Sequence, residues 1–256
     1  MDKTLLKGLA MLEMLTEMGG DARTIETIAE RMQLTRSNTH RTLQTLIHAG
    51  YVRRDIRTGG YRSTLRMFEM GSQQLHQLDV RKLAPAFMSK LARETGDTVH
   101  LSILDGHDVV YIDKVDSLQP IRAYSMVGGR APAHAVATGK ALLAAQAADF
   151  LDRWIAPLQR YTRSTIVDLP ALRAELAKVS RVGYAINRGE WRDGVGGLAA
   201  TVFDGLERPV AALGISGPLE RLSVARMKEY APIVIQATLE LSTALGYSRG
   251  FLGASI

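Results

Sequence analysis

The sequence predicts an α+β protein with an N-terminal winged helix-turn-helix and a C-terminal mixed sheet domain. Helical apolar spacing divides residues 3–49 into three short helices. Residues 51–63 then change to a period near two around Thr58-Gly59-Gly60, which is typical of a hairpin. Beyond residue 97, strand-like and helix-like segments follow one another without regular βαβ spacing, which favours an α+β sheet domain.

Three helices are expected in the N-terminal winged helix-turn-helix, residues 1–64, which is called the head below. The apolar spacing of the first predicts a helix over 3–18 that ends at Gly19-Gly20. The second is expected over 24–33, with Thr24 as its N-cap. The third is expected over 36–49, and its apolar positions indicate a buried side. That side consists of Leu43, Leu46 and Ile47, and Gly50 is the expected residue after the helix.

The third helix and the hairpin carry the positive charge of the chain. Residues 31–66 hold eight arginines and one acidic residue, Asp55, a net charge of +7, whereas the whole chain carries +6. A basic segment on an otherwise nearly neutral protein is the electrostatic signature of a polyanion partner. A solvated basic face that binds nothing is the alternative.

Double-stranded DNA is the predicted partner, because its major groove admits one α-helix whose side chains reach base edges. The groove-facing side chains are expected to be Arg36, Ser37, Asn38, His40 and Arg41. The hairpin arginines expected on flanking phosphates or in a minor groove are Arg53, Arg54, Arg57 and Arg62. Winged helices also dock proteins, and that is the alternative for this head.

The predicted domains are 1–64 for the winged helix-turn-helix, 65–78 for a linker helix and 79–256 for the C-terminal domain. Further helices are expected over 81–95, 138–148, 170–179 and 222–245. Strands are expected over 99–104, 108–115, 121–127, 194–202 and 209–215.

Three segments of the C-terminal domain are candidates for a ligand site. Residues 128–141 lead small side chains into a helix start, where backbone amides and the helix dipole favour a carboxylate. Plain helix packing through alanines is the alternative. Residues 183–197 have the composition of a glycine-dense loop with polar and aromatic groups able to enclose a ligand. Residues 214–218 place Ser216 at a strand end as a hydrogen-bond donor.

Enzymatic and metal chemistry is disfavoured. The chain has no cysteine, so it can have neither a disulfide nor a thiolate site. A P-loop is excluded because His134 stands where its first glycine is required and Ala141 follows Lys140. Pro218 breaks the GxSxG nucleophile elbow. An enzyme would have to use Ser216, His134 and Asp193, and we expect no catalytic residue, no metal and no cofactor.

The chain is expected to be cytoplasmic and to have no membrane partner. Its composition, 46% hydrophobic and 23% charged, is that of a globular protein. No apolar run approaches the roughly 20 residues of a membrane span, and the N-terminus lacks the apolar core of a signal peptide.

Motifs along nearly the whole chain resemble the IclR family of bacterial transcriptional regulators. They are LTRSNTHRTLQTLIHAGYVRR, LARETGDTVHLSILDGHDVVYIDKVD, GGRAPAHAVATGKALLA, GYAINRGEW, and AATVFD followed by VAALGISGP. The resemblance implies a winged-helix domain, a linker helix and a GAF-like effector-binding domain. It also implies a homodimer or homotetramer, a near-palindromic DNA operator and a small organic acid or aromatic effector.

The resemblance further implies an effector pocket. Its members would be the backbone amides of Ala137 and Thr138, and Asn187, Gly197, Gly214 and Ser216. Some relatives carry Cys and Ser at the positions of Gly197 and Gly214. Two glycines leave more room and fewer donors, so we expect an effector larger or less polar than a two- or three-carbon acid.

The predicted function is a ligand-responsive DNA-binding transcriptional regulator, more often a repressor than an activator. Effector binding is expected to act through the linker helix on the spacing of two recognition helices. The alternative is a constitutive DNA-binding protein whose C-terminal domain serves only oligomerisation.

Overall fold

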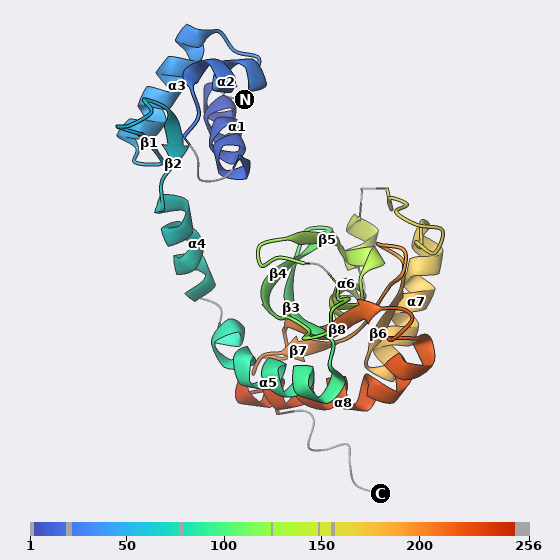
Figure 1. Cartoon of the computed structure of the whole chain (residues 1–256). Coiled ribbons are helices and arrows are strands. Elements are labelled where there is room, and N and C mark those ends of the chain that lie inside the picture. The colour runs from blue at the N-terminus through green and yellow to red at the C-terminus, as the bar shows by residue number, and fades with distance from the viewer. Residues whose placement is uncertain are drawn as a thin grey trace, which may run out of the picture. The chain divides into compact units, whose positions relative to one another are not determined.

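The computed structural model describes residues 3–18, 22–76, 79–123, 125–147, 149–154 and 157–248 (Figure 1). They belong to two compact units, residues 1–77 and 78–256. Within the described ranges, no helix combines the length and the apolar character that crossing a membrane requires.

The first unit is built from helices and one hairpin. Its helices are α1 (Lys3–Glu17), α2 (Ile25–Arg31), α3 (Arg36–His48) and α4 (Arg66–His76), and its strands are β1 (Val52–Arg54) and β2 (Tyr61–Ser63). Thr24 and Thr35 cap α2 and α3 by accepting from the backbone N–H of Thr27 and Asn38. Gly50 follows α3 with a φ of 80°, which confirms its predicted role. The predicted end of the first helix, Gly19-Gly20, lies outside the described residues.

Apolar side chains of α1, α2, α3 and the hairpin form the core of the head. Met11, Ile28 and Leu43 are fully buried there, whereas the predicted core residues Leu46 and Ile47 are only partly buried. The hairpin is tied to the start of α2, because Tyr61 and Arg23 exchange both backbone hydrogen bonds at 2.7 and 2.8 Å. These contacts hold the hairpin rigidly beside the three helices.

The second unit contains one antiparallel sheet with the strand order β5-β4-β3-β8-β7-β6. Its strands are β3 (Thr98–Asp105), β4 (Asp108–Val115), β5 (Arg130–Pro132), β6 (Ala185–Arg188), β7 (Val195–Phe203) and β8 (Pro209–Pro218). Its helices are α5 (Asp79–Thr95), α6 (Ala137–Ala144), α7 (Leu169–Val182) and α8 (Val224–Ala244), with short 3₁₀ turns at Ala133–Ala135 and Phe150–Arg153.

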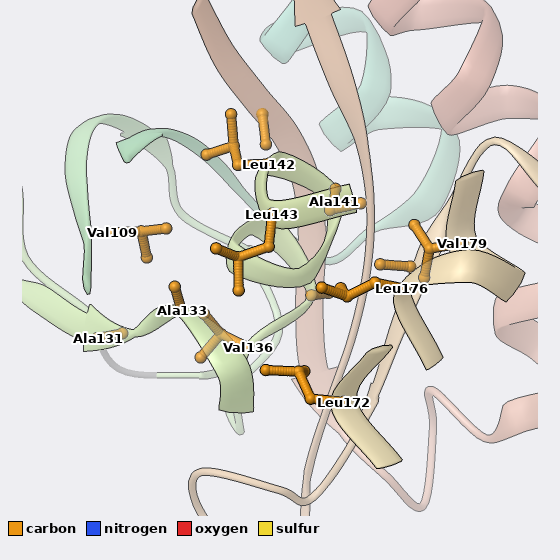
Figure 2. Packing of buried hydrophobic residues seen from close by; sticks show 14 of the residues in the cluster. Val109, Ala131, Ala133, Val136, Ala141, Leu142, Leu143, Leu172, Leu176 and Val179 are labelled. Atoms are coloured by element: carbon orange, nitrogen blue, oxygen red, sulfur yellow. The ribbon is translucent and has the colours of Figure 1, made fainter. Parts of the chain in front are cut away.

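The helices cover the two faces of this sheet. The α5 and α8 helices pack together on one face, and α6 and α7 pack on the other (Figure 1). Figure 2 shows the core on the second face, to which α6 contributes Leu142 and Leu143, β4 contributes Val109, and α7 contributes Leu172 and Leu176. The short α6 helix is therefore enclosed, and its N-terminus lies inside the domain.

Two sequence predictions for this unit were wrong. Residues 121–127 were expected to form a strand, but the described part of 116–129 is a loop, and β5 takes the place beside β4. Gly128 (φ 84°) turns the backbone, and Tyr111 of β4 bonds to both Gly128 and Gly129. Regular pairing with β4 therefore begins only after this turn, at β5. Residues 183–197 have the composition of a loop, yet they include β6, which was not expected, and the start of β7, which agrees with the strand expected over 194–202. The glycine at 196 serves close packing instead, since a Cβ there would lie 2.8 Å from side-chain atoms of Leu219 and Met227.

Candidate nucleic-acid interface and ligand cavity

The five predicted α3 residues are all exposed, but they point in different directions. Arg36, Ser37 and His40 face the hairpin, and Asn38 Oδ1 accepts from Nζ of Lys7 on α1 at 3.3 Å. At 100° per residue, Arg41 lies on the outermost line of the helix, opposite the buried Thr39 and Leu43. The face centred on Arg41 is therefore the part of α3 that could reach most deeply into the major groove of a DNA duplex.

A groove of about 750 Å³ separates the start of α3 from the hairpin. Arg36, Ser37 and His40 line one wall, and Arg54 lines the other together with residues 58–61. One acidic side chain, Glu26, also lines it and approaches Arg36 at 3.0 Å, with both side chains more than half exposed. An exposed ion pair of this kind contributes only about 0–1 kcal/mol, so Arg36 can exchange Glu26 for a phosphate.

The hairpin turn is organised by Asp55. Its Oδ1 accepts from the backbone N–H of Thr58 and Arg57 at 2.9 and 3.0 Å. These bonds, that of Thr58 first, hold the pKa of Asp55 below its usual value despite some opposing desolvation. Asp55 also lies 3.7 Å from the guanidinium of Arg62, which is about one-third exposed.

The four predicted hairpin arginines are therefore not equivalent. Arg53, Arg54 and Arg57 are exposed, and Arg54 Nε donates to the carbonyl of Gly59 at 3.0 Å. Arg53 and Arg62 are direct cross-strand partners, so they share a face that Arg54 does not. Arg62 is held by Asp55 and is the least available of the four.

Two further polar residues lie on this surface. Gln44 is exposed one turn after His40, and the Nε2 atoms of the two side chains are 3.4 Å apart. The helical period could have identified it, because positions 37, 41 and 44 share a face. Lys7 comes from α1, 31 residues before Asn38. No sequence spacing signals that contact.

A separate cavity of about 50 Å³ lies in the second unit, between the start of α6 and the sheet. Five of the six residues implied by the resemblance line it: Ala137, Thr138, Asn187, Gly197 and Ser216. Gly214 is not among the lining residues. A Cβ there would lie 2.6 Å from the Cβ of Ala199 and from the carbonyl oxygen of Leu198, so this glycine permits close packing of β8 on β7.

The α6 end of the cavity presents donors. The N-cap residue Val136 makes no side-chain cap bond, and Ala137 and Thr138 in the first turn face the cavity. First-turn N–H groups have no partner within their own helix and favour an anion. Asn187 Oδ1 accepts from the backbone N–H of Glu190 at 2.8 Å, which leaves its amide N–H₂ without a partner among the described residues.

Beside the cavity, a buried ion pair fixes α6 to the turn after β6. Lys140 Nζ lies 2.7 and 2.8 Å from the two carboxylate oxygens of Glu190, and both side chains are at most 1% exposed. Glu175 of α7 adds a third oxygen at 3.2 Å. Glu190 thus bonds to α6 through its carboxylate and to Asn187, a lining residue of the cavity, through its backbone N–H.

Three further side chains of the cavity wall were not singled out from the sequence as ligand groups: His100, Tyr111 and Ser125. Trp191 and Arg192 also line the cavity, and they belong to the 183–197 segment that was expected to enclose a ligand. The bulk of these side chains keeps the cavity small although Gly197 lines it. The expectation of an effector larger or less polar than a two- or three-carbon acid stays a prediction. Burial, with a smaller effect of Lys114, lowers the pKa of His100 from 6.5 to about 4, and burial raises that of Tyr111 to about 12. Both side chains are neutral at physiological pH.

The structure does not bring together the three residues of the enzyme alternative, Ser216, His134 and Asp193. Ser216 Oγ lies 3.3 Å from His100 Nδ1, whereas His134 Nε2 bonds to the carbonyl of Gln159 at 3.0 Å. Asp193 is exposed to solvent. Within the described ranges, no three His, Asp or Glu side chains gather as metal ligands would.

Comparison with known proteins finds matches to both units of the chain. The family model for the IclR helix-turn-helix domain matches residues 4–55, and the model for the bacterial transcriptional regulator IclR C-terminal domain matches residues 72–243. The transcriptional repressor AllR of Klebsiella pneumoniae is 35% identical over 246 residues, which is 95% of this chain and 90% of that protein.

Solved structures give the same picture. The Thermotoga maritima IclR structure has a TM-score of 0.81 at 30% identity and covers 95% of this chain and 99% of that one. An IclR homologue from Microbacterium hydrocarbonoxydans, complexed with 4-hydroxybenzoate, has a TM-score of 0.77 at 25% identity and covers 93% and 98%.

Proposed function

Since the chain belongs to the IclR family of bacterial transcriptional regulators, we propose that its first unit grips an operator while its second unit senses a small organic acid. The chain is a DNA-binding regulator of transcription. The observation that carries the proposal is the coexistence of an exposed basic groove in one unit and an enclosed, donor-rich cavity in the other. We place the protein in the cytoplasm, where a bacterial regulator meets its DNA.

In the first unit, α3 is the recognition helix and the hairpin is the wing. Arg41 and Ser37 face the base edges, and Gln44 extends the same line. Asn38 acts at one edge of the contact together with Lys7, and His40 and Arg36 act at the other edge beside the wing. Arg53, Arg54 and Arg57 hold flanking phosphates, with Arg62 supporting the turn through Asp55.

A homodimer is supported by apolar surface on the first unit. The exposed side chains on and beside α1 and α4 are Leu5, Leu6, Leu9, Leu65, Phe68 and Met70. Two helices of one small unit that both leave apolar side chains in water favour pairing with a second copy. A two-fold dimer presents two recognition helices and therefore reads a near-palindromic operator.

The proposed effector is a compact organic acid. Its carboxylate accepts from the first-turn amides of α6, and Asn187 and Ser216 add side-chain donors. A cavity of about 50 Å³ fits a few heavy atoms, so the carboxylate and one short substituent fill it as it stands. The 4-hydroxybenzoate of the Microbacterium homologue supports the acid class. An aromatic acid in this chain would require Trp191 or Tyr111 to move.

The regulation proposed is a coupling between the two sites, with repression as the ground state, and no catalysis. An effector can change DNA binding only if it binds the two arrangements of the protein unequally. The chain between the sites runs through α4, whose start contacts the head: Tyr51 Oη donates to Met70 Sδ at 3.1 Å. This helix is the proposed path of the signal.

Two measurements on the full chain test the proposal. Fluorescence anisotropy with duplex DNA should show tight binding at low salt that weakens steeply as salt rises. A thermal-shift screen of organic acids should find stabilisation by short carboxylates and none by matched amines. DNA binding without stabilisation by any acid would favour the constitutive alternative, and absence of DNA binding at low salt would overturn the proposal.

A further inference from the structure

Three side chains of the cavity wall, Ser216, His100 and Ser125, form a hydrogen-bond chain in which His100 and Ser125 are buried and Ser216 is partly buried. Ser216 Oγ lies 3.3 Å from Nδ1 of His100, and Ser125 Oγ lies 2.6 Å from Nε2 of the same ring. The three residues come from β8, β3 and the 116–129 loop, and all of them line the cavity. The chain therefore connects the ligand site to a loop on the surface.

The donor and acceptor roles along this hydrogen-bond chain can be arranged in two directions. A neutral imidazole has one N–H donor and one acceptor nitrogen, and a serine hydroxyl can take either role. In the first arrangement Ser216 donates to Nδ1, and Nε2–H donates to Ser125. In the second, Ser125 donates to Nε2, and Nδ1–H donates to Ser216. The lowered pKa of His100, about 4, keeps the ring neutral in both.

We propose that an effector oxygen accepting a hydrogen bond from Ser216 reverses the chain, so that His100 reports occupancy of the cavity to the 116–129 loop. The hydroxyl of Ser216 has one proton. When it points at the effector, Nδ1 must carry a proton and Nε2 must accept. The ring loses one proton at Nε2 and gains one at Nδ1 by exchange with water, so its charge does not change. The inference rests on the proposed function, because it requires an effector in this cavity.

The 116–129 loop is suited to receive the signal. The loop is held at three points. The side chain of Ser117 donates through Oγ to the carbonyl of Gly96 at 2.6 Å, and the loop carbonyls of Ile121 and Ser125 accept from Arg221 at 3.2 Å and from Lys114 Nζ at 2.8 Å. When Nε2 changes from donor to acceptor, Ser125 must turn its hydroxyl toward the ring. The loop also exposes apolar side chains, among them Leu118 and Met126. A change at Ser125 is thus transmitted to apolar surface.

The same logic defines the chemical class of ligand that the protein detects. A carboxylate or keto oxygen beside Ser216 accepts its proton and reverses the chain. An ammonium group of similar size cannot accept, so Ser216 keeps donating to Nδ1. His100 is therefore a specificity-determining residue that distinguishes acceptors from donors at one end of the cavity.

Nuclear magnetic resonance of the full chain tests the proposal, with acetate as probe and ethylammonium as its control. The ¹⁵N signals of His100, assigned with His100→Gln, should change from the Nε2–H to the Nδ1–H tautomer as millimolar acetate is added. The methyl signal of Met126, assigned with Met126→Leu, should shift in parallel. Ethylammonium should change neither signal.

Variants separate the chain of bonds from general damage. Ser216→Ala should abolish the tautomer change. Ser125→Ala should keep the acetate-induced shifts of the Ala137 and Thr138 amides but lose the shift of Met126. Ser102→Ala is the matched control. Ser102 is a buried serine on β3, the strand of His100, and its Oγ has no hydrogen-bond partner among the described residues. This variant should behave as the parent protein.

The outcomes distinguish the inference from the function on which it rests. Acetate that shifts the Ala137 and Thr138 amides while the His100 signals stay unchanged would overturn the chain reversal and leave the proposed function in place. If acetate shifts none of these signals, the carboxylate site itself is wrong, and the inference falls with it.

Discussion

The two functional regions of this protein treat charge in opposite ways. In the head, most of the arginines are exposed to solvent, and the side chains of the ion pair Arg36–Glu26 are 75% and 60% exposed. In the second unit, Lys140 and Glu190 form a pair whose side chains are 0% and 1% exposed. The difference shows that exposed charges are left free for a charged partner, whereas buried charges are satisfied internally and serve to shape a cavity.

The largest effect is expected from breaking the buried pair. Lys140→Ala removes the buried cation of Glu190 and leaves only the half-exposed Arg188, at 3.7 Å, beside its carboxylate. The free energy of unfolding should therefore fall by up to about 3–5 kcal/mol. Urea unfolding followed by circular dichroism measures it. A loss below about 1 kcal/mol, the value typical of exposed pairs, would remove the contrast between the two regions.

A pH effect of similar size is expected in the same unit. Burial lowers the pKa of His100 to about 4, so below pH 6.5 the unfolded chain takes up a proton that the folded chain does not. Stability contributed by the neutral ring is complete above pH 6.5 and should be lost as the pH falls toward 4, by roughly 3 kcal/mol in total. Unfolding at pH 7 and pH 5 should show a smaller difference in His100→Gln than in the parent. Identical differences would contradict burial of the ring.

Removing an exposed arginine from the head should change its DNA affinity and not its free energy of unfolding. Arg41→Ala removes the outermost cation of α3 and should cost about 1–3 kcal/mol of DNA affinity, or roughly 5- to 150-fold. Anisotropy titrations measure the change. Arg181→Ala, an exposed arginine on α7, is the control and should bind DNA as the parent does. Equal losses in both variants would show that only net charge matters.

Adding one carbon to the cavity should separate its function from that of the head. In Gly197→Ala the new Cβ would lie 3.5 Å from the Cβ of Ala137 and 3.7 Å from that of Asn187. It should lower affinity for a bound acid by about 10-fold or more, since overpacking costs about 1–3 kcal/mol. Calorimetry measures it. Gly8→Ala, with open space around the new carbon, should leave the affinity unchanged.

The smallest effect is expected from the exposed pair. Glu26→Gln should change the free energy of unfolding by at most about 1 kcal/mol. It should raise DNA affinity a few-fold at low salt, because Arg36 no longer has to exchange a carboxylate for a phosphate. Weaker DNA binding in this variant would instead indicate that Glu26 itself contacts the DNA.

The head could be predicted from sequence because its logic is local. Helical period alone assigned Leu43 to the core and Arg41 to the outside, and Thr58-Gly59-Gly60 located the hairpin turn. What escaped prediction came from outside the helix, such as the contact of Lys7 with Asn38. Short helices and strands whose apolar residues follow a clear period leave few alternative folds for the head.

The cavity was predictable only in part. The resemblance supplied residues such as Ala137 and Asn187, but His100 and Tyr111 meet Ser216 there because β4, β3 and β8 are neighbours in the sheet. That strand order is a tertiary property without a signal in the spacing of residues. The alternating pattern of 121–127 also suggested a strand, although Ala123 and Ser125 are buried because they line the cavity.

The central claim is that an acid in the cavity changes how the head binds DNA. The direct measurement is the Kd of the full chain for a duplex selected from random DNA, with and without the acid that most raises its Tm. We predict a change of about 5-fold or more in the parent protein and little change in Gly197→Ala. If the acid binds and the Kd stays the same, the two regions are independent, and the account of this protein as a ligand-responsive regulator is wrong.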